Sequence, residues 1–265
     1  MPTPFDLLRD PISLAVIAIY AGLIAWEAIA PARRLTPSPY WRTRGLISFG
    51  VYFLLSSYLP LFWGEYFASL QVFDLTGLGT WGGALAGLLV YELGAYAYHR
   101  SMHSSTILWR GLHQMHHSAE RLDAFGAFWF NPTDMVGWTA LSSLALTLVI
   151  GITPTATVIV MLTVTLLGVF QHCNIRTPQW LGYVVQRPES HSLHHARDVH
   201  ANNYADLPLF DLIFGTFANP RDFADANGFY DGASQRIGDM LLFRDVSQPS
   251  GSKREPKASL VSTQT

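Results

Sequence analysis

Residues 113–120 read HQMHHSAE, a stretch that places three histidines at positions i, i+3 and i+4. Residues 191–195 repeat this grouping as HSLHH, and residues 99–103 carry a looser pair in HRSMH. Because residues three and four apart share one face of a helix, each group can direct its imidazoles to one side. All ten histidines of the chain fall between residues 99 and 200. This pattern indicates one shared histidine-rich region.

The composition around these groups is strongly apolar. The chain has 265 residues, of which 49% are hydrophobic and 14% charged, with a net charge of −2 and a mean hydropathy of +0.21. Soluble domains carry roughly 25% charged residues, and nucleic-acid binding needs a basic stripe. The composition therefore favours a membrane protein and argues against a nucleic-acid partner. Cys173 is the single cysteine, which excludes an intramolecular disulfide and a cysteine-based zinc site.

Long apolar runs predict membrane helices, each of which needs about 20 mostly apolar residues. The runs cover residues 12–31, 46–63, 80–98 and 135–171. The last run is too long for one span, and the break Gly151-Ile152-Thr153-Pro154 divides it into a helical hairpin, with Thr153 as N-cap and Pro154 at the first helical position. We therefore expect an all-α fold, a polytopic membrane bundle of about four to five spanning or hairpin helices.

The arginines predict an orientation for this bundle. Four of them lie between the first two apolar runs, whereas residues 64–79 contain neither Lys nor Arg. The positive-inside rule then places the N-terminus outside and the histidine-rich segments in a helical cap on the cytoplasmic face. We expect residues 1–243 to form one integral-membrane domain, and the polar residues 244–265 to form a disordered tail.

The histidine groups predict a metal centre. Clustered imidazoles repel one another when protonated and are costly to bury without partners, and a metal ion resolves both difficulties. Imidazole suits zinc, copper, iron and nickel. A tetrahedral zinc takes at most four ligands, so eight or nine convergent histidines fit two metal ions better than one. Glu92 shares a helix face with His99 and His103, and we expect it to hold a ring N–H of one of them.

Taken together, the boxes HRSMH, HQMHHS and HSLHHARD resemble those of the fatty acid hydroxylase superfamily, which includes sterol desaturases and sphingolipid and fatty acid hydroxylases. The segment QHCNIR at residues 171–176 adds to the similarity, which runs from about residue 92 to residue 217. Two departures stand out. Trp129 and Asn131 occupy positions where many relatives carry Arg and His, and Arg176 stands where some relatives carry a further histidine.

The resemblance implies a membrane-bound, non-haem di-iron oxygenase that uses O2 and external electrons to hydroxylate a C–H bond of a lipid. Carried over by position, it implies nine iron ligands: His99, His103, His113, His116, His117, His172, His191, His194 and His195. His200 is a tenth candidate. Glu92, Asn174 and Asp198 are the expected residues that orient the ligands.

An external electron donor, a ferredoxin or a cytochrome with its reductase, is the expected protein partner. The chain has no Rossmann glycine fingerprint and no cysteine set for an iron–sulfur cluster. The lipid itself stays open among acyl chains, sphingoid bases, ornithine- or glycerol-linked lipids, sterols and carotenoids, all of which suit an apolar site at a membrane face.

Three other functions stay open at this point. A lipid or sterol desaturase would use the same di-iron site. A membrane zinc hydrolase would need an activating carboxylate in a motif such as HExxH, which the sequence lacks. A divalent-metal transporter would place its histidines in the middle of its spans rather than at their ends.

Overall fold

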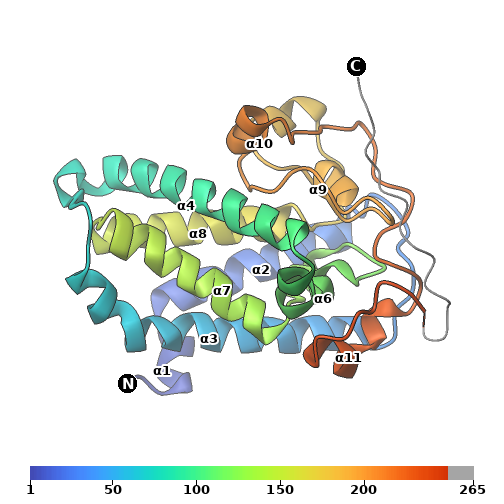
Figure 1. The fold of residues 1–265 in the computed structure, drawn as a ribbon, viewed down its shortest axis with the longest axis horizontal. Helices are drawn as coiled ribbons and strands as arrows, with labels where there is room; N and C mark the ends of the chain where they lie inside the picture. Colours follow the sequence, from blue (N-terminus) through green and yellow to red (C-terminus); the bar gives the residue numbers. More distant parts are fainter. Residues whose placement is uncertain (250–265) are drawn as a thin grey trace.

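The computed structural model describes residues 1–249, and within this range the regular structure is helical, with one isolated bridge between Ala196 and Asn227. Figure 1 shows the long helices lying along one another as a bundle, while the shorter helices of the second half of the chain gather at one end. The long helices are α2 (Pro11–Ile29), α3 (Trp41–Ser69), α4 (Gly79–Ser104), α7 (Pro132–Ser143) and α8 (Pro154–Phe170).

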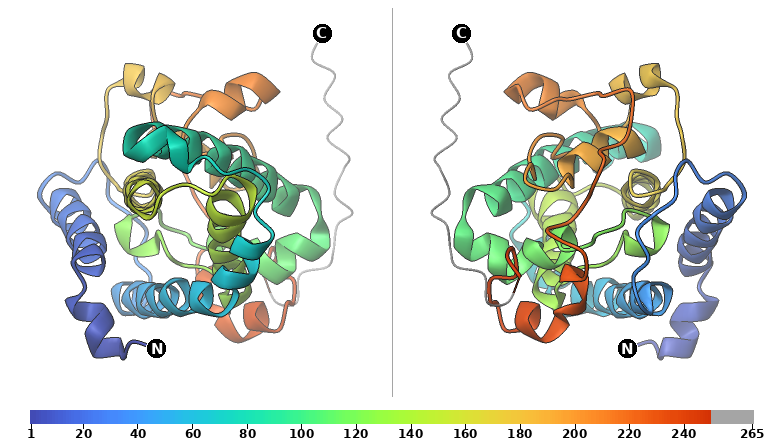
Figure 2. Two further views of the ribbon diagram at one scale, coloured as in Figure 1. Left: turned by 90° about the vertical axis from the view of Figure 1, so that its left-hand side faces the viewer. Right: turned by 90° about the vertical axis from the view of Figure 1, so that its right-hand side faces the viewer.

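Short helices connect and cover the bundle. They are α1 (Pro4–Arg9), η1 (Thr76–Leu78), α5 (Thr106–Leu108), η2 (Trp109–His113), α6 (Gln114–His117), η3 (Ala124–Gly126), η4 (Leu144–Val149), η5 (Gln179–Tyr183), α9 (Pro188–His194), α10 (Leu209–Phe214), η6 (Ala233–Gln235) and α11 (Ile237–Leu241). Two of them, η2 and η4, are π-helical turns that continue an α-helical segment. In the two end-on views of Figure 2, the helices of the bundle are seen to lie around a common centre.

Side-chain caps set where several long helices begin. The side chain of Asp10 accepts hydrogen bonds from the first turn of α2, and Pro11 follows it. The predicted break at residues 151–154 is confirmed, because the Thr153 hydroxyl accepts from the backbone N–H of Ala156 and Pro154 opens α8. Each cap satisfies backbone N–H groups that have no partner inside the helix.

The core of the bundle forms where α4 packs against α8 and α3 against α7. Small residues allow the first of these contacts. A Cβ atom on Gly87 would lie 2.8 Å from Ile152 and 3.0 Å from Val160, and one on Gly83 would lie 3.2 Å from Ala156. The two helices therefore approach more closely than larger side chains would permit.

Two helices, α2 and α3, are long and apolar enough to cross a membrane by length and composition. Both leave large apolar side chains on the surface, such as Trp26, Ile47 and Phe62. The runs 80–98 and 135–171 also form helices, namely α4 and the hairpin of α7, η4 and α8. The all-helical prediction is therefore confirmed, whereas the count of four to five spans remains an expectation.

The predicted disordered tail needs a correction at its start. Val246 is fully buried, and the Gln114 side chain holds this segment by donating to the Arg244 carbonyl at 2.8 Å and accepting from the Val246 N–H at 3.4 Å. Polar composition concealed this contact because one apolar side chain, packed in a cluster with Met240, is enough to anchor the segment. The prediction is wrong for residues 244–249, and residues 250–265 lie outside the described residues.

Candidate metal centre

The elements that carry the predicted ligand histidines meet at one end of the bundle (Figure 1). Two histidines come from the last turns of α4, three from η2 and α6, one from the turn after α8, and three from α9 and its C-cap. The π-helical turn η2 ends on His113, and such turns are frequent at functional sites. Segments more than 90 residues apart in the chain thus supply one cluster.

The structure divides the nine histidines into two groups, and within each group one nitrogen from every ring lies within 4.8 Å of those of the other rings. We call them the five-histidine group and the four-histidine group. The five-histidine group contains His99, His103, His113, His117 and His194. The four-histidine group contains His116, His172, His191 and His195. All nine predicted ligand positions are therefore brought together, and each group has the four or five nitrogens expected for one metal ion.

Backbone carbonyls fix three rings of the five-histidine group. One loop, residues 196–204, presents the carbonyls of three alternate residues, 200, 202 and 204, each to an Nδ1–H of the group. The pairs are His99 with Tyr204 at 2.9 Å, His103 with His200 at 2.8 Å, and His194 with Asn202 at 2.6 Å. A carbonyl oxygen only accepts, so each Nδ1 carries the proton and each Nε2 is left with a free lone pair.

This loop reaches its shape through backbone conformations that few residue types adopt easily. Asp198, His200, Asn202 and Asn203 all have φ between 44° and 67°. Asp, Asn and His are the non-glycine residues most often found in this left-handed region. The side chain of Asn203 also holds the loop in place, because it donates to the Ser190 and Ala218 carbonyls. The local sequence is therefore suited to the turn that presents the carbonyls.

A carboxylate fixes a fourth ring. The Nδ1 atom of His113 lies 2.8 Å from Oδ2 of Asp134, and both side chains are buried. Asn131 caps the first turn of α7 through its side-chain oxygen, and Pro132 follows, so Asp134 is held at the third position of that helix. The Asn131 that departs from the family pattern thus starts the helix that carries this carboxylate.

Asp134 is a functional residue that the sequence did not predict, although Asn131 nearby stood out as a departure from the family pattern. The local signal was Asn131 followed by Pro132, a pattern typical of a helix N-terminus, with an acidic residue in the first turn. What the sequence lacked was the partner: the Asp134–His113 contact joins residues 21 positions apart on different helices.

The nitrogens of the four-histidine group also lie close together. The Nε2 atom of His172 lies 3.0 Å from Nε2 of both His116 and His191, and the His191 Nε2 lies 3.1 Å from that of His195. The His172 Nδ1 donates to the Gly168 carbonyl at 2.6 Å, which leaves its Nε2 as an acceptor. Four Nε2 atoms that all converge on one point suit a shared cation, because their lone pairs would otherwise repel.

Several inward nitrogens of the five-histidine group are buried without a hydrogen-bond partner among the described residues. They are Nε2 of His103, His117 and His194. A buried polar atom without a partner costs free energy. Imidazole nitrogens that converge, carry free lone pairs and lack other partners form the donor set that zinc, copper, iron or nickel takes. The residues present therefore fit two metal ions.

Burial keeps these imidazoles neutral at neutral pH. It lowers the pKa of His172 to about 4, and the neighbouring imidazoles add to the effect of burial in lowering the pKa of the others well below the usual range. These others, outside the long helices, are His113, His116, His117, His191, His194 and His195. Neutral imidazole is the form that binds a metal ion.

His200, the tenth candidate, belongs to neither group. Its backbone carbonyl accepts from His103, and its ring Nδ1 lies 3.0 Å from Nδ1 of His117. The ring therefore contacts the outward side of His117 rather than the converging Nε2 atoms. This geometry gives His200 the position of a supporting residue.

The predicted role of Glu92 is wrong. Its Oε2 accepts from the backbone N–H groups of Asp206 and Leu207, both at 3.0 Å, and not from a histidine. The helix face shared by Glu92 and His99 suggested contact, but the loop that carries Tyr204 inserts a carbonyl at the His99 Nδ1 instead. Glu92 therefore does not contact His99 through this hydrogen bond. It stabilises the backbone at residues 206 and 207, close to Tyr204, whose carbonyl accepts from the His99 ring.

The two other predicted supporting residues also bond elsewhere. The Asn174 side chain donates to the Arg33 carbonyl at 2.7 Å, and its backbone N–H donates to Glu27, so Asn174 ties the turn after α8 to the last turns of α2 and to the segment that follows α2. Asp198 is exposed at the surface, at a left-handed position of the carbonyl-bearing loop. Neither side chain donates to or accepts from a histidine ring within residues 1–249, because sequence proximity to His172 and His200 did not determine where the side chains point.

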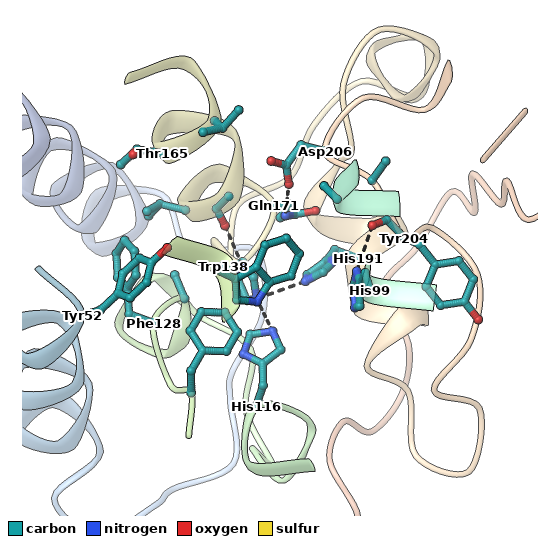
Figure 3. A pocket seen from close by; sticks show the side chains of 18 of the residues that line it. Tyr52, His99, His116, Phe128, Trp138, Thr165, Gln171, His191, Tyr204 and Asp206 are labelled. Atoms are coloured by element: carbon teal, nitrogen blue, oxygen red, sulfur yellow. Dashed lines mark hydrogen bonds between the residues drawn. The ribbon is translucent and has the colours of Figure 1, made fainter. Parts of the chain in front are cut away.

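A cavity of about 110 Å³ lies against both histidine groups (Figure 3). His99 and His113 line it from the five-histidine group, and His116, His172 and His191 from the other. Most of the remaining wall is apolar or aromatic: Tyr52, Phe128, Phe130, Trp138, Met161 and Val164. Both groups thus face one largely apolar space next to the helices α3 and α8.

Comparison with known proteins agrees with this arrangement. Residues 84–216, which include both histidine groups and most of the cavity wall, match the family model described as fatty acid hydroxylase. The chain belongs to the fatty acid hydroxylase family. No solved structure matches it.

Curated relatives of this family member act on several lipids. It is 32% identical over 139 residues to an ornithine lipid hydroxylase of Rhizobium tropici, covering 51% of the chain and 41% of the relative. It is 33% identical over 149 residues to an alkylglycerol monooxygenase of Danio rerio, covering 54% and 31%. A sphinganine C4-monooxygenase of Arabidopsis thaliana is 25% identical over 137 residues, covering 50% and 53%. The matches span about half of these relatives or less.

Proposed function

We propose that this protein is a membrane-bound, non-haem di-iron oxygenase that hydroxylates a C–H bond of a lipid. The observation that carries the proposal is the convergence of nine imidazoles, in groups of five and four, beside one largely apolar cavity that five of them line. Iron is one of the metals that imidazole binds, and the resemblance to the fatty acid hydroxylase superfamily favours it over zinc, copper and nickel. The family membership and the lipid-modifying relatives support the same reading.

The proposed ligands are the nine histidines of the two groups, each binding through Nε2 toward the centre of its group. When bound, the two irons supply the activation of O2 that oxygen insertion into a C–H bond requires. The protein's own residues do the rest. The carbonyl-bearing loop and Asp134 hold the rings in one tautomer and orientation. The aromatic wall holds an apolar chain and excludes water from the site.

We propose further that the chain is a multi-pass membrane protein with this site on the cytoplasmic face. The two apolar helices α2 and α3 support membrane insertion. The hairpin of α7, η4 and α8 and the helix α4 are the candidates for the remaining spans. The arginines that flank the histidine end of the bundle support the cytoplasmic orientation, because positively charged loops stay on that side.

The proposed electron donor is a separate protein, a ferredoxin or a cytochrome with its reductase. A polar pocket of about 520 Å³ opens beside the five-histidine group and is lined by His103, Trp109 and His200 among others. The ring centroid of Trp109 lies 5.0 Å from those of both His103 and His117. This aromatic contact gives the donor a short route to the five-histidine group from the polar side, away from the apolar cavity.

Mass spectrometry of lipids tests the function. Cells that express the wild type are compared with cells that express His116→Ala and with cells that express Asp222→Asn, a control at an exposed ion pair with Arg176. We expect one lipid class to gain a single oxygen atom in the wild type and the control only. A loss of two hydrogens would identify a desaturase instead. No change in any lipid, although the wild type is folded, iron-loaded and reduced, would contradict the oxygenase assignment.

A further inference from the structure

The apolar cavity has a polar end that the metal centre does not use. Asp206 and Gln171 both line the cavity, and the Gln171 Nε2 donates to the Asp206 Oδ1 at 2.7 Å. In Figure 3 the two side chains point toward one another at the upper edge of the cavity, above Trp138 and the histidines. Gln171 directly precedes His172, so this polar pair lies next to the four-histidine group.

A second carboxyl group stands directly behind this pair. The Oε2 atom of Glu92 accepts the backbone N–H of Asp206 at 3.0 Å, whereas its Oε1 is buried with no hydrogen-bond partner in the described part of the chain. Burial raises the pKa of Asp206, although the hydrogen bond from Gln171 acts in the opposite direction. No Lys or Arg is among the residues that line the cavity, all of which lie within residues 1–249.

The carboxyl oxygens at this end of the cavity are only partly satisfied. Asp206 Oδ1 accepts one N–H of the Gln171 amide, and Glu92 Oε2 accepts two backbone N–H groups, whereas Glu92 Oε1 has no partner among the described residues. Buried polar groups cost free energy unless they find partners. In ligand cavities, a few placed polar groups in an apolar wall are the usual means of orienting a ligand. An ionised carboxyl group only accepts, so the group that pairs with the Asp206 carboxylate from the cavity is a hydrogen-bond donor.

We propose that Asp206 and Gln171 bind a hydrogen-bond donor on the substrate, a hydroxyl or an amide N–H, and that this contact selects lipids that carry the donor close to the carbon that is oxidised. The inference rests on the proposed function and adds the substrate class to it. A free carboxylate is rejected at the same place, because it would bring an anion against two carboxyl groups without a cation to balance them.

The size of the cavity sets the position of the oxidised carbon. A dry cavity of roughly 150 Å³ can hold a benzene molecule, and this cavity, at about 110 Å³, is smaller. Only a short segment of a lipid therefore fits, with the polar pair and the histidines in contact with that same segment. Oxidation then falls within a few bonds of the donor group, and the terminal methyl of a long chain lies outside the cavity.

Matched lipid probes test the selectivity by binding, independently of turnover. The iron-loaded full chain in nanodiscs is titrated with N-tetradecylacetamide and with tetradecyl acetate, which differ in the amide N–H. A second pair, 1-tetradecanol and its methyl ether, tests the hydroxyl, and tetradecanoate tests the carboxylate. We expect each donor-bearing probe to bind about tenfold more tightly than its partner. Tetradecanoate is expected to bind no more tightly than the ester.

Substitutions locate the effect. For each probe pair we compare the dissociation constant of the probe without the donor with that of the donor-bearing probe. In Asp206→Leu this ratio is expected to fall to about one. In Asp206→Asn, which keeps the size of the side chain, it is expected to fall by at least about threefold. The exposed Asp222→Leu serves as the matched control and keeps the wild-type ratios. Iron content is measured in each variant, since the loop of Asp206 also carries the Tyr204 carbonyl that holds His99. If Asp206→Leu does not fold or loses iron, Asp206→Asn decides.

The outcomes separate this inference from the proposed function. Probe ratios near one in the wild type, or ratios unchanged in the folded Asp206 variants, would overturn the selectivity. A wild type that binds the amide selectively but oxidises no lipid would preserve the selectivity and contradict the oxygenase. Mass spectrometry of oxidised N-tetradecylacetamide supplies the position: oxygen near the nitrogen supports the inference, and oxygen at the terminal methyl overturns it.

Discussion

The carboxylate of Asp134 lies 2.8 Å from the Nδ1 atom of His113, and neither side chain is exposed to solvent. The other carboxylate oxygen accepts from the Tyr98 hydroxyl at 3.1 Å. Asp134 is therefore held from two sides, and it in turn fixes the plane of the His113 ring with Nε2 directed at the five-histidine group. A carboxylate in this position also raises the basicity of the imidazole, which strengthens a metal–nitrogen bond.

Removing this carboxylate is expected to weaken metal binding while the fold is retained. Loss of such an outer partner typically lowers metal affinity or activity by about 10- to 100-fold. We expect Asp134→Asn, which still accepts a hydrogen bond, to lie at the lower end and Asp134→Ala at the upper end. Iron affinity is measured by competition with a chelator, with Asp222→Asn as control. Equal affinity in Asp134→Ala and the wild type would contradict the role assigned to Asp134.

Iron counting distinguishes His200 from the nine grouped histidines. We expect His117→Ala to lose the iron of the five-histidine group and His116→Ala that of the four-histidine group, so each retains about one iron per chain. His200→Asn tolerates the left-handed backbone, keeps the carbonyl that accepts from His103, and is expected to retain both irons. Loss of one iron in a folded His200→Asn protein would make His200 a ligand.

The clustering of the imidazoles could be predicted because most of the histidine pattern is local. Groups such as HQMHH place their imidazoles together through helix periodicity, and the nine positions that the family resemblance implied are the nine that converge. The break at residues 151–154 is likewise local, since Thr153 and Pro154 act on the helix that they begin. Both features are determined by residues within a few positions of one another.

Supporting residues were predicted poorly because their contacts cross the fold. Glu92 shares a face with His99 on α4, yet the residue that reaches the His99 Nδ1 is Tyr204, 105 positions away, and it does so with a backbone carbonyl. A carbonyl has no sequence signature. Asp134, by contrast, had a local signal for its place on a helix but none for its partner.

Acid is expected to destabilise the metal-free protein. Burial holds the pKa of His172 at about 4 in the folded chain, against about 6.5 when unfolded. The unfolded chain thus binds more protons below pH 6.5, so stability is complete above that pH and falls toward pH 4, by about 3 kcal/mol for this residue alone. Thermal midpoints at pH 7.5, 6 and 5 measure the effect. A midpoint that stays constant or rises on acidification would contradict neutral burial.

One contact between α3 and the loop after the second histidine box offers a matched pair of glycine substitutions. A Cβ atom on Gly45 would overlap the backbone carbonyl of Phe125, whereas nothing lies within 4 Å of a Cβ on Gly50 in the same helix. The Phe125 backbone belongs to η3, and the residues that follow, Ala127 and Phe128, line the apolar cavity. The space left by Gly45 therefore sets the distance between a candidate membrane helix and the wall of the site.

We expect Gly45→Ala to lower the stability of the protein by about 1–3 kcal/mol, because the carbonyl must move. Gly50→Ala is expected to raise it by up to about 1 kcal/mol, since alanine restricts the unfolded chain and favours the helix. Thermal midpoints in the same detergent measure both changes. Gly45→Ala should also alter lipid binding through the displaced cavity wall, and Gly50→Ala should not. Equal effects of the two substitutions on stability and binding would mean that helix propensity, and not the contact with Phe125, determines the outcome.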